Sequence, residues 1–392
     1  MDYTKLLNQR LTGLKPSGIR RFFDIANEMD HVISLSIGEP DFTTPWHVRQ
    51  EGIETLRKGQ TWYSPNRGFE ELRKQISNYY ARRFNVEYDP DQEILVSVGG
   101  SEAIDLCIRA LVQEGDEVLI PQPAFVCYEP MTIMAGGTPV IIETKAEDAF
   151  RLTAEQLEAA ITPRTKLLIL PFPNNPTGAV MRREHLEAIA KVIEKHDILV
   201  LSDEIYGELT YGKERHVSFA DIPHMKERTI VVSGFSKAYA MTGWRLGYAL
   251  GPEPVISQML KLHQYAIMSA PTTAQYAAIE ALKHGDNDIE HMREEYDMRR
   301  RLIVDEFGRM GMTCFEPEGA FYVFPSIQVS GMTSEDFCEK LIYAQRVAIV
   351  PGTAFGDCGE GFARVSYSYS LKHIQEALVR IEKFLNEKHS EG

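Results

Sequence analysis

Cysteine is scarce in this chain, and the few cysteines lie too far apart to indicate a disulfide framework or a zinc site. The 392 residues include only Cys107, Cys127, Cys314, Cys338 and Cys358, with no Cys-x-x-Cys pair. An odd number of separated thiols is typical of a reducing compartment. We therefore expect a cytoplasmic protein without disulfides and without a metal site.

Basic charge and long apolar runs are also missing. The chain holds 42 Lys and Arg against 56 Asp and Glu, a formal net charge of -14, which repels nucleic acid and anionic lipid. No window reaches the roughly 18 apolar residues of a membrane span. The polar start, MDYTKLLNQRLTGLKPSG, does not resemble a secretory signal. We expect neither a nucleic-acid nor a membrane partner, so an anionic ligand has to be bound by local side chains.

Several nucleophile and metal motifs are absent as well. The chain contains no Gly-x-x-x-x-Gly-Lys-[Ser/Thr], no His-Glu-x-x-His and no Gly-x-Ser-x-Gly. These absences argue against a P-loop enzyme, a zinc protease and a serine hydrolase.

The middle of the chain alternates short apolar runs with amphipathic stretches, as βαβ units do. Apolar repeats at helical spacing are clearest at 104–111 and 183–196. We therefore predict a large α/β domain over 46–285, with a mostly parallel, helix-flanked sheet. Its strands are expected at 94–98, 117–120, 139–143, 166–170, 198–202, 229–233 and 246–250.

The two ends of the chain have a different pattern. A long charged helix at 288–310 is followed by short strand-like runs, GAFYVFP, VAIVP and ARVSYS, and by a terminal helix. We predict a smaller α+β domain over 286–392. Residues 1–45 contain a short strand that leads into a Gly/Pro-rich turn, SLSIGEPDF, and are expected to pack with the smaller domain.

Small and polar residues follow the predicted strands of the large domain. In an open parallel sheet, ligands bind beyond the carboxyl ends of the strands. Five of the seven strands, including the one before Phe125, end in such segments and point to one site. The other four segments are Gly99-Gly100-Ser101-Glu102, PFPNNPTG, Asp203-Glu204-Ile205-Tyr206 and GFSKAYAMTGWRLGY.

Gly99 and Gly100 allow close approach of the backbone, and the helix that follows presents free N–H groups to an anion. Alone, the pair is equally an ordinary turn before a helix. Ser236 and Arg245 favour a phosphate site, because a hydroxyl and a guanidinium are ligands that a phosphate monoester needs.

Lys237 follows an apolar strand in a glycine-bearing turn. A lysine that is desolvated beside another cation, here Arg245, loses its proton and becomes a nucleophile for imine formation. A solvated surface lysine is the alternative interpretation.

Three other side chains have both a functional and a structural interpretation. Asp203 follows ILVLS, where a buried carboxylate needs a cationic partner or else serves as a turn residue. Asn175 lies in a turn that aims its amide into the site or only shapes the chain. Arg364 stands inside the apolar run ARVSYSY, where it binds a ligand carboxylate or an internal acid.

The segments SIGEPDF, YSPNRGFEELR, NNPTG, SDEIY, SGFSKAYAMTGWRLGY and ARVSYS together resemble the class I/II aminotransferases, the fold-type I branch of pyridoxal-phosphate enzymes. The match runs in order across nearly the whole chain. The nearest similarity is to the bacterial and archaeal subgroup that acts on aspartate, alanine or aromatic amino acids.

The resemblance implies a role for each matching residue. Lys237 would carry pyridoxal phosphate as a Schiff base and move a proton, Asp203 would pair with the pyridinium nitrogen, and Asn175 and Tyr206 would bind the ring oxygen. The catalytic set is then Lys237, Asp203 and Tyr206. The cofactor-binding set is Gly100, Ser101, Glu102, Phe125, Asn175, Asp203, Tyr206, Ser233, Ser236, Lys237, Arg245 and Tyr63.

Substrate binding is implied for Gly38, Asn175 and Arg364, the last on the α-carboxylate. Tyr63 would reach the neighbouring subunit's site, so a homodimer with shared active sites is expected. In aspartate-handling relatives a lysine stands where this chain has Ser101. An alanine or aromatic donor is therefore expected to be better than aspartate, with a 2-oxo acid such as 2-oxoglutarate as acceptor.

Two other functions stay open at this point. The same cofactor site would support a C–S β-lyase. A ligand-sensing regulator built on an aminotransferase-like domain is the other alternative, but the short amino-terminal arm leaves no room for a helix-turn-helix segment.

Overall fold

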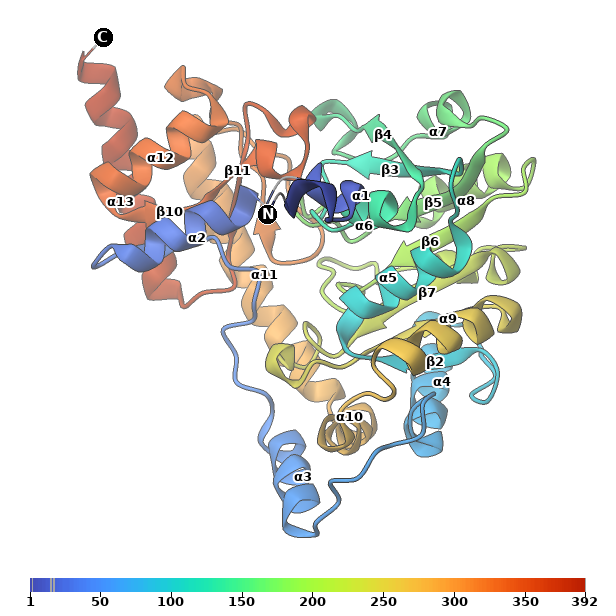
Figure 1. Ribbon diagram of the computed structural model, residues 1–392. Helices are drawn as coiled ribbons and strands as arrows, with labels where there is room; N and C mark the ends of the chain where they lie inside the picture. The colour runs from blue at the N-terminus through green and yellow to red at the C-terminus, as the bar shows by residue number, and fades with distance from the viewer. Residues whose placement is uncertain (2, 15, 17, 392) are drawn as a thin grey trace.

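The computed structural model describes residues 1, 3–14, 16 and 18–391. Figure 1 shows a large sheet covered by helices on both faces, and beside it a smaller group of helices and short strands from the two ends of the chain. This is the mixed α/β architecture that the sequence pattern predicts. No helix in the described part of the chain is long and apolar enough to cross a membrane.

All seven predicted strands are present and form one sheet in the order β2-β8-β7-β6-β5-β3-β4. Only β8 runs antiparallel to its neighbours, so the carboxyl ends of β2, β3, β5, β6 and β7 lie at one edge. The strands are β2 (Ile94–Ser97), β3 (Glu117–Gln122), β4 (Thr138–Glu143), β5 (Thr165–Leu170), β6 (Leu199–Asp203), β7 (Thr229–Gly234) and β8 (Gly247–Leu250).

Successive strand residues face opposite sides of the sheet, and both sides are buried. Leu167 and Ile169 pack in one cluster with residues of α5, while Leu168 and Leu170 pack with residues of α8. The helices of this part are α3 (Trp46–Arg57), α4 (Glu70–Phe84), α5 (Gly99–Leu111), α6 (Tyr128–Ala135), α7 (Ala154–Ala160), α8 (Arg183–Ile193), α9 (Glu253–Ala266) and α10 (Thr272–His284).

The carboxyl-terminal part has its own core beneath a three-stranded antiparallel sheet of order β11-β12-β9. Its helices are α11 (Asp286–Arg309), α12 (Ser334–Gln345) and α13 (Leu371–Glu391). Its strands are β9 (Tyr322–Val323), β10 (Val347–Ala348), β11 (Val350–Pro351) and β12 (Ala363–Ser366).

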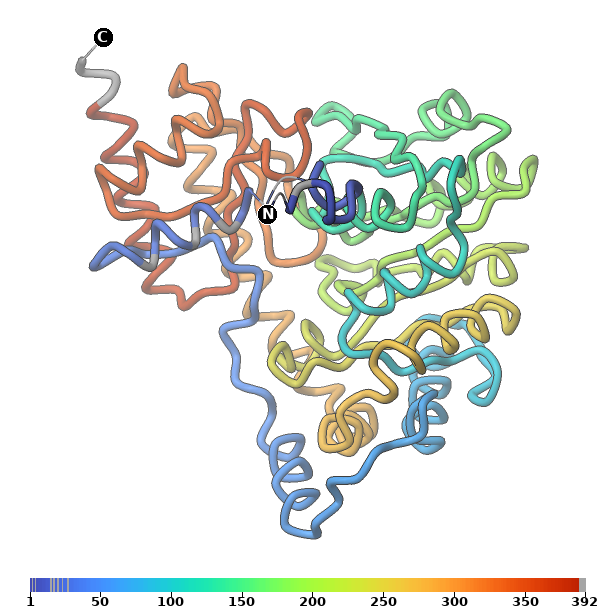
Figure 2. Tube along the Cα trace, in the orientation of Figure 1, coloured from blue at the N-terminus to red at the C-terminus, as the bar shows by residue number. Residues whose placement is uncertain are grey.

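The amino-terminal segment contacts both parts of the molecule. The short strand β1 (Ile33–Ser34) pairs in parallel with β10, and α2 (Gly18–Glu28) lies against β10 and β11. Figure 2 shows the first residues, in dark blue, beside the green segment of α6. There α1 (Gln9–Thr12) meets α6, so this segment reaches the helices of the large sheet.

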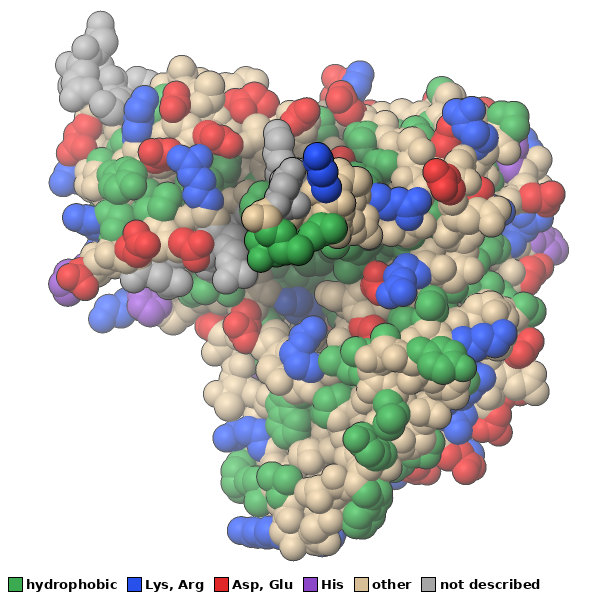
Figure 3. Space-filling view, viewed as in Figure 1, with side chains coloured by type: hydrophobic (Ala, Val, Ile, Leu, Met, Phe, Trp, Pro, Cys, Tyr) green, Lys and Arg blue, Asp and Glu red, His purple; other side chains and the backbone are tan. Residues whose placement is uncertain are grey.

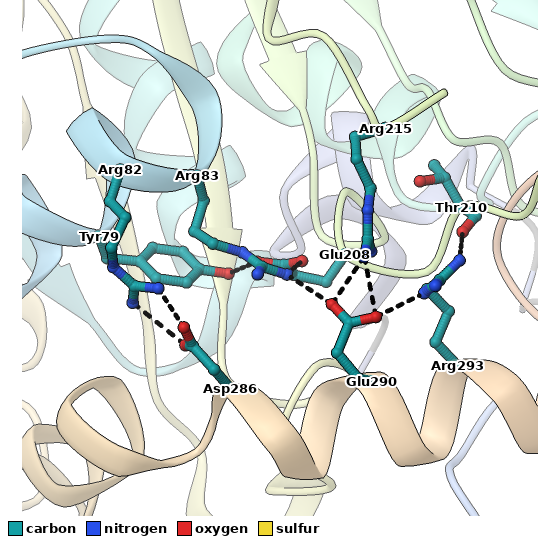
Figure 4. A network of polar contacts seen from close by, with 9 residues as sticks. All are labelled: Tyr79, Arg82, Arg83, Glu208, Thr210, Arg215, Asp286, Glu290 and Arg293. Atoms are coloured by element: carbon teal, nitrogen blue, oxygen red, sulfur yellow. Dashed lines mark hydrogen bonds and ion pairs between the residues drawn. The ribbon is translucent and has the colours of Figure 1, made fainter. Parts of the chain in front are cut away.

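A network of ion pairs joins α4 to α11 through the loop after β6 (Figure 4). The buried Glu208 accepts hydrogen bonds from Tyr79 and from Arg83, whose Nε lies 2.9 Å from Oε1. Glu290 of α11 accepts from Arg215 at 2.9 Å and from Arg293 at 3.1 Å. Each of these carboxylates therefore meets at least one guanidinium.

Candidate active site

A cavity of about 380 Å³ lies at the edge where the strands of the large sheet end. Figure 3 shows a hollow below the amino-terminal segment, with basic side chains at its floor. Eleven predicted site residues line the cavity: Gly38, Gly100, Ser101, Phe125, Asn175, Asp203, Tyr206, Ser236, Lys237, Arg245 and Arg364.

Lys237 lies just beyond β7, and its ammonium donates a hydrogen bond to the carbonyl of Gly38. The nitrogen is 5.7 Å from the ring centre of Tyr206 and 5.5 Å from that of Phe321. No carboxylate forms an ion pair with it in the described part of the chain. The lysine is therefore enclosed by rings and a carbonyl rather than neutralised.

This environment lowers the pKa of Lys237 to about 8, mainly through burial. The guanidiniums of Arg364 and Arg245 lower the pKa further, while Glu39 opposes them. A pKa near 8 leaves a substantial fraction of the amine neutral at physiological pH, which is the nucleophilic and basic form.

Asp203 ends β6 and is buried. Its Oδ2 accepts a hydrogen bond from the Tyr128 hydroxyl at 2.7 Å, and its Oδ1 accepts from the backbone N–H of Ile205 at 3.2 Å. Burial raises the pKa of Asp203 to about 6, although both hydrogen bonds oppose the shift. A carboxylate in this state gains most from a cationic partner in the cavity.

The turn after β5 is organised by Asn174, whose amide bonds to the carbonyls of Pro123 and Pro171 and whose oxygen accepts from Thr177. With Asn174 holding the turn, its neighbour Asn175 faces the cavity. Of the two consecutive asparagines, Asn174 therefore has a structural role, and the side chain of Asn175 faces the cavity.

Arg364 lies in the fully buried strand β12. Its Nη1 donates to Asn175 Oδ1 at 2.9 Å, its Nη2 donates to the Ser36 carbonyl, and its Nε has no partner. The guanidinium lies between the rings of Tyr322 and Phe355, at 4.6 and 4.8 Å. No acidic side chain of the described residues pairs with it, so this buried cation lacks a counter-charge.

Close packing of backbone shapes the opposite end of the cavity. Gly99 has a φ of +78°, and a Cβ there would lie 2.5 Å from the Arg245 guanidinium. A Cβ on Gly247 would lie 2.5 Å from the backbone of Gly99. The start of α5, with its free N–H groups, thus lies against the Arg245 guanidinium, and both kinds of group attract an anion.

Three predicted residues do not line this cavity. Glu102 turns back to the N–H of Val98 and pairs with His263 at 2.7 Å. The buried Ser233 hydroxyl donates to the Glu204 carbonyl at 3.3 Å. Tyr63 is 78% exposed on the surface and lies outside the lining of this cavity.

Sequence reasoning missed two tyrosines that line the cavity, Tyr128 and Tyr322. The Tyr322 hydroxyl lies 2.8 Å from that of Tyr206, and a Cβ on Gly38 would collide with it. Tyr128 follows Phe125 by three residues, and this spacing could have indicated that both side chains face the cavity. Nothing in the local sequence marks Tyr322, because its partners are distant in the chain.

The family model described as aminotransferase class I and II matches residues 30–381. An aspartate aminotransferase of Pyrococcus abyssi is 45% identical, covering 97% of this chain and 99% of the relative. Aromatic-amino-acid aminotransferase 2 of Thermococcus litoralis is 43% identical, with the same coverage. The crystal structure of an aromatic aminotransferase from Pyrococcus horikoshii matches with a TM-score of 0.90 at 44% identity, covering 94% of this chain and 99% of that chain.

Proposed function

The chain belongs to the class I and II aminotransferases, and we propose that it moves amino groups from L-amino acids to 2-oxo acids with pyridoxal phosphate held at Lys237. The observation that carries the proposal is the combination, in one cavity, of a lysine with a depressed pKa, a buried carboxylate and a buried unpaired guanidinium. Each of these groups lacks the partner that an amino acid and this cofactor would supply.

Members of this family use pyridoxal phosphate, and the residues of the cavity fit that group. The amino terminus of α5, with Ser236 and Arg245, would hold its phosphate. Asp203 would hold its ring nitrogen, because that carboxylate is buried without a cation. Phe125 lies on the cavity wall and would stack on the ring.

Bound pyridoxal phosphate supplies an electron sink for the charge that develops at the substrate α-carbon. The chain's own contribution there is the Lys237 amine, which is partly neutral and accepts and returns the α-carbon proton. Arg364 binds the substrate carboxylate through its unpaired Nε, and the hydrogen bond from its Nη1 to Asn175 orients it. The rings of Tyr322 and Phe355 exclude water from this guanidinium.

We propose alanine or an aromatic amino acid as the preferred donor, with 2-oxoglutarate as an acceptor and aspartate as a weaker donor. The cavity wall includes Ile19, Ile37 and Phe125. Ser101 stands where the resemblance to aspartate-handling aminotransferases implies a lysine. A second carboxylate would therefore meet apolar side chains and a hydroxyl rather than a dedicated cation.

We also propose a homodimer in the cytoplasm. Trp62, Tyr63 and Ile267 line one surface groove and are exposed, as apolar residues of a dimer interface are in a single chain. All five cysteines are free thiols, which fits a reducing compartment. We further propose that the chain is divided into an amino-terminal segment, residues 1–45, a large domain, residues 46–285, and a small domain, residues 286–392. The cavity lies between the large and the small domain.

The test is a panel of amino donors, with alanine, phenylalanine, tyrosine and aspartate each supplied with 2-oxoglutarate and pyridoxal phosphate. Glutamate formation that requires both the donor and the cofactor is expected. Release of pyruvate from cystathionine without any 2-oxo acid, in the absence of glutamate formation, would instead identify a C–S β-lyase.

A further inference from the structure

Tyr128, which is not among the predicted site residues, lies in hydrogen-bonding contact with Asp203. It is the first residue of α6, is 2% exposed, and lines the cavity. Its hydroxyl donates to Asp203 Oδ2 at 2.7 Å. Its carbonyl accepts a hydrogen bond from Thr132 at 2.9 Å, which ties the residue into the helix.

The Tyr128 hydroxyl is one of few hydrogen-bond donors to the Asp203 carboxylate. Among the described residues no lysine, arginine or histidine forms an ion pair with Asp203, and its only other donor is the N–H of Ile205 at the longer distance of 3.2 Å. A buried carboxylate needs hydrogen bonds to stay ionised and to keep one orientation. Tyr128 supplies the shorter of the two and binds one defined oxygen.

The same ring also contacts the wall on which a flat ligand would stack. The rings of Tyr128 and Phe125 meet edge to face, with centres 6.1 Å apart and planes at 82°. One side chain therefore links the carboxylate at the cavity floor to the aromatic wall above it. This arrangement sets the direction of Asp203 relative to the plane that Phe125 defines.

We propose that Tyr128 is a positioning residue for transamination, which acts through Asp203 by orienting its carboxylate and keeping it ionised toward the cofactor ring nitrogen. The role rests on the proposed function, because the ring nitrogen is that of pyridoxal phosphate. Tyr128 itself takes no part in proton transfer to substrate.

The contribution of Tyr128 can be measured through the pKa of Asp203. The titratable groups that face it are Tyr128 and Cys127 at the start of α6, and Glu204 and Tyr206 in its own segment. Burial raises the pKa of Asp203 to about 6, and the Tyr128 hydrogen bond is the largest opposing effect. Its removal should therefore raise the titration midpoint further.

The experiment titrates Asp203 in the cofactor-free protein by infrared difference spectroscopy, following the carboxyl band that Asp203→Asn abolishes. Tyr128→Phe should shift the midpoint upward by about one to two pH units, the equivalent of one hydrogen bond to a charged group. Tyr88→Phe is the matched control, because Tyr88 is buried and its hydroxyl has no partner. This control should leave the Asp203 midpoint in place.

A midpoint in Tyr128→Phe equal to that of the control would overturn the proposal. If Tyr128→Phe does not fold, 3-fluorotyrosine at position 128 keeps the shape and makes the hydroxyl a stronger donor, so the midpoint should fall. With pyridoxal phosphate added, Tyr128→Phe should also change the visible circular dichroism of the bound cofactor. Failure of the unmodified protein to bind pyridoxal phosphate would refute the proposed function, whereas the titration would still report on Tyr128.

Discussion

The network between α4 and α11 and the cavity at the strand ends both contain charged side chains that are buried or partly buried. Only in the network is each carboxylate paired with a guanidinium. Glu290 meets three guanidiniums, and its pKa falls to about 2. Asp203 meets a phenol and one N–H, and its pKa rises to about 6. The two carboxylates differ in burial as well as in partners, because Asp203 is buried while Glu290 is 29% exposed.

The arginines show the same contrast. Arg83 donates to Glu208 and Glu290. Among the residues that the structure describes, Arg364 donates only to uncharged oxygens, and its Nε has no hydrogen-bond partner. A buried charge without its counter-charge costs stability, so a folded protein retains it where a ligand completes the pair. Incomplete pairing, rather than the presence of charge, therefore distinguishes the side chains of the cavity from those of the network.

The largest expected effect is on the cavity side, from Lys237→Ala. Removal of the amine should lower the transamination rate by about 10⁴-fold or more, because the proton acceptor at the α-carbon is lost. Stability should not fall, since the lost group is a poorly solvated cation with a lowered pKa. Initial rates and thermal unfolding measure the two effects, and Lys261→Ala, on the exposed face of α9, is the control.

Asp203→Asn should lower the rate by about 10²- to 10³-fold, as loss of a preorganised electrostatic contact does. The folded-state pKa lies above the ordinary value, so ionisation of Asp203 opposes folding as the pH rises through about 6. The cofactor-free variant should therefore be about 3 kcal/mol more stable than the unmodified protein at pH 8, with little gain near pH 4. A loss of stability at pH 8 would place Asp203 with the network residues.

Ser101→Lys should introduce into the cavity the cation that the site lacks for a second carboxylate. The ratio of kcat/KM for aspartate to that for alanine is expected to rise by about 10- to 100-fold, the equivalent of one charge-assisted hydrogen bond. Ser101→Gln has similar length without the charge and serves as control. Equal ratios in both variants would mean that another cation already recognises the distal carboxylate.

The smallest effect is expected in the network, from Glu290→Gln. The pKa of Glu290 lies below its ordinary value, so its ionised form stabilises the fold above about pH 4.5, and this stability is lost as the pH falls through about 2. Because the side chain is 29% exposed, we expect a loss of only about 1–2 kcal/mol at pH 7. Glu376→Gln, in an exposed pair with Arg380, should change stability by less than about 0.5 kcal/mol. Unchanged stability in Glu290→Gln would remove the contrast between the two regions.

The sequence allowed the strands and most of the cavity wall to be predicted, because both follow from local patterns. The apolar runs identify the strands, and the residues directly after them, such as Asp203 and Lys237, reach the cavity wherever the strands are parallel. Glu102 also follows a strand, but helix α5 turns its carboxylate back toward Val98 and His263.

Contacts between distant segments could not be predicted in this way. Tyr322 meets Tyr206 across 116 residues. The unpaired state of Arg364 depends on all the described segments around it, none of which places an acid against the guanidinium. The ion pairs around Glu290 likewise join α4, the loop after β6 and α11. Such features depend on tertiary packing, and a single sequence carries no local signal for them.

The most direct test of the account is to locate the cofactor on the chain. The protein is loaded with pyridoxal phosphate, reduced with borohydride, digested and analysed by mass spectrometry. We expect one pyridoxyl group per chain, on Lys237, and its loss when an amino-acid substrate is added before reduction. A pyridoxyl group on another lysine, or none on Lys237, would contradict the central claim that this cavity is the catalytic site.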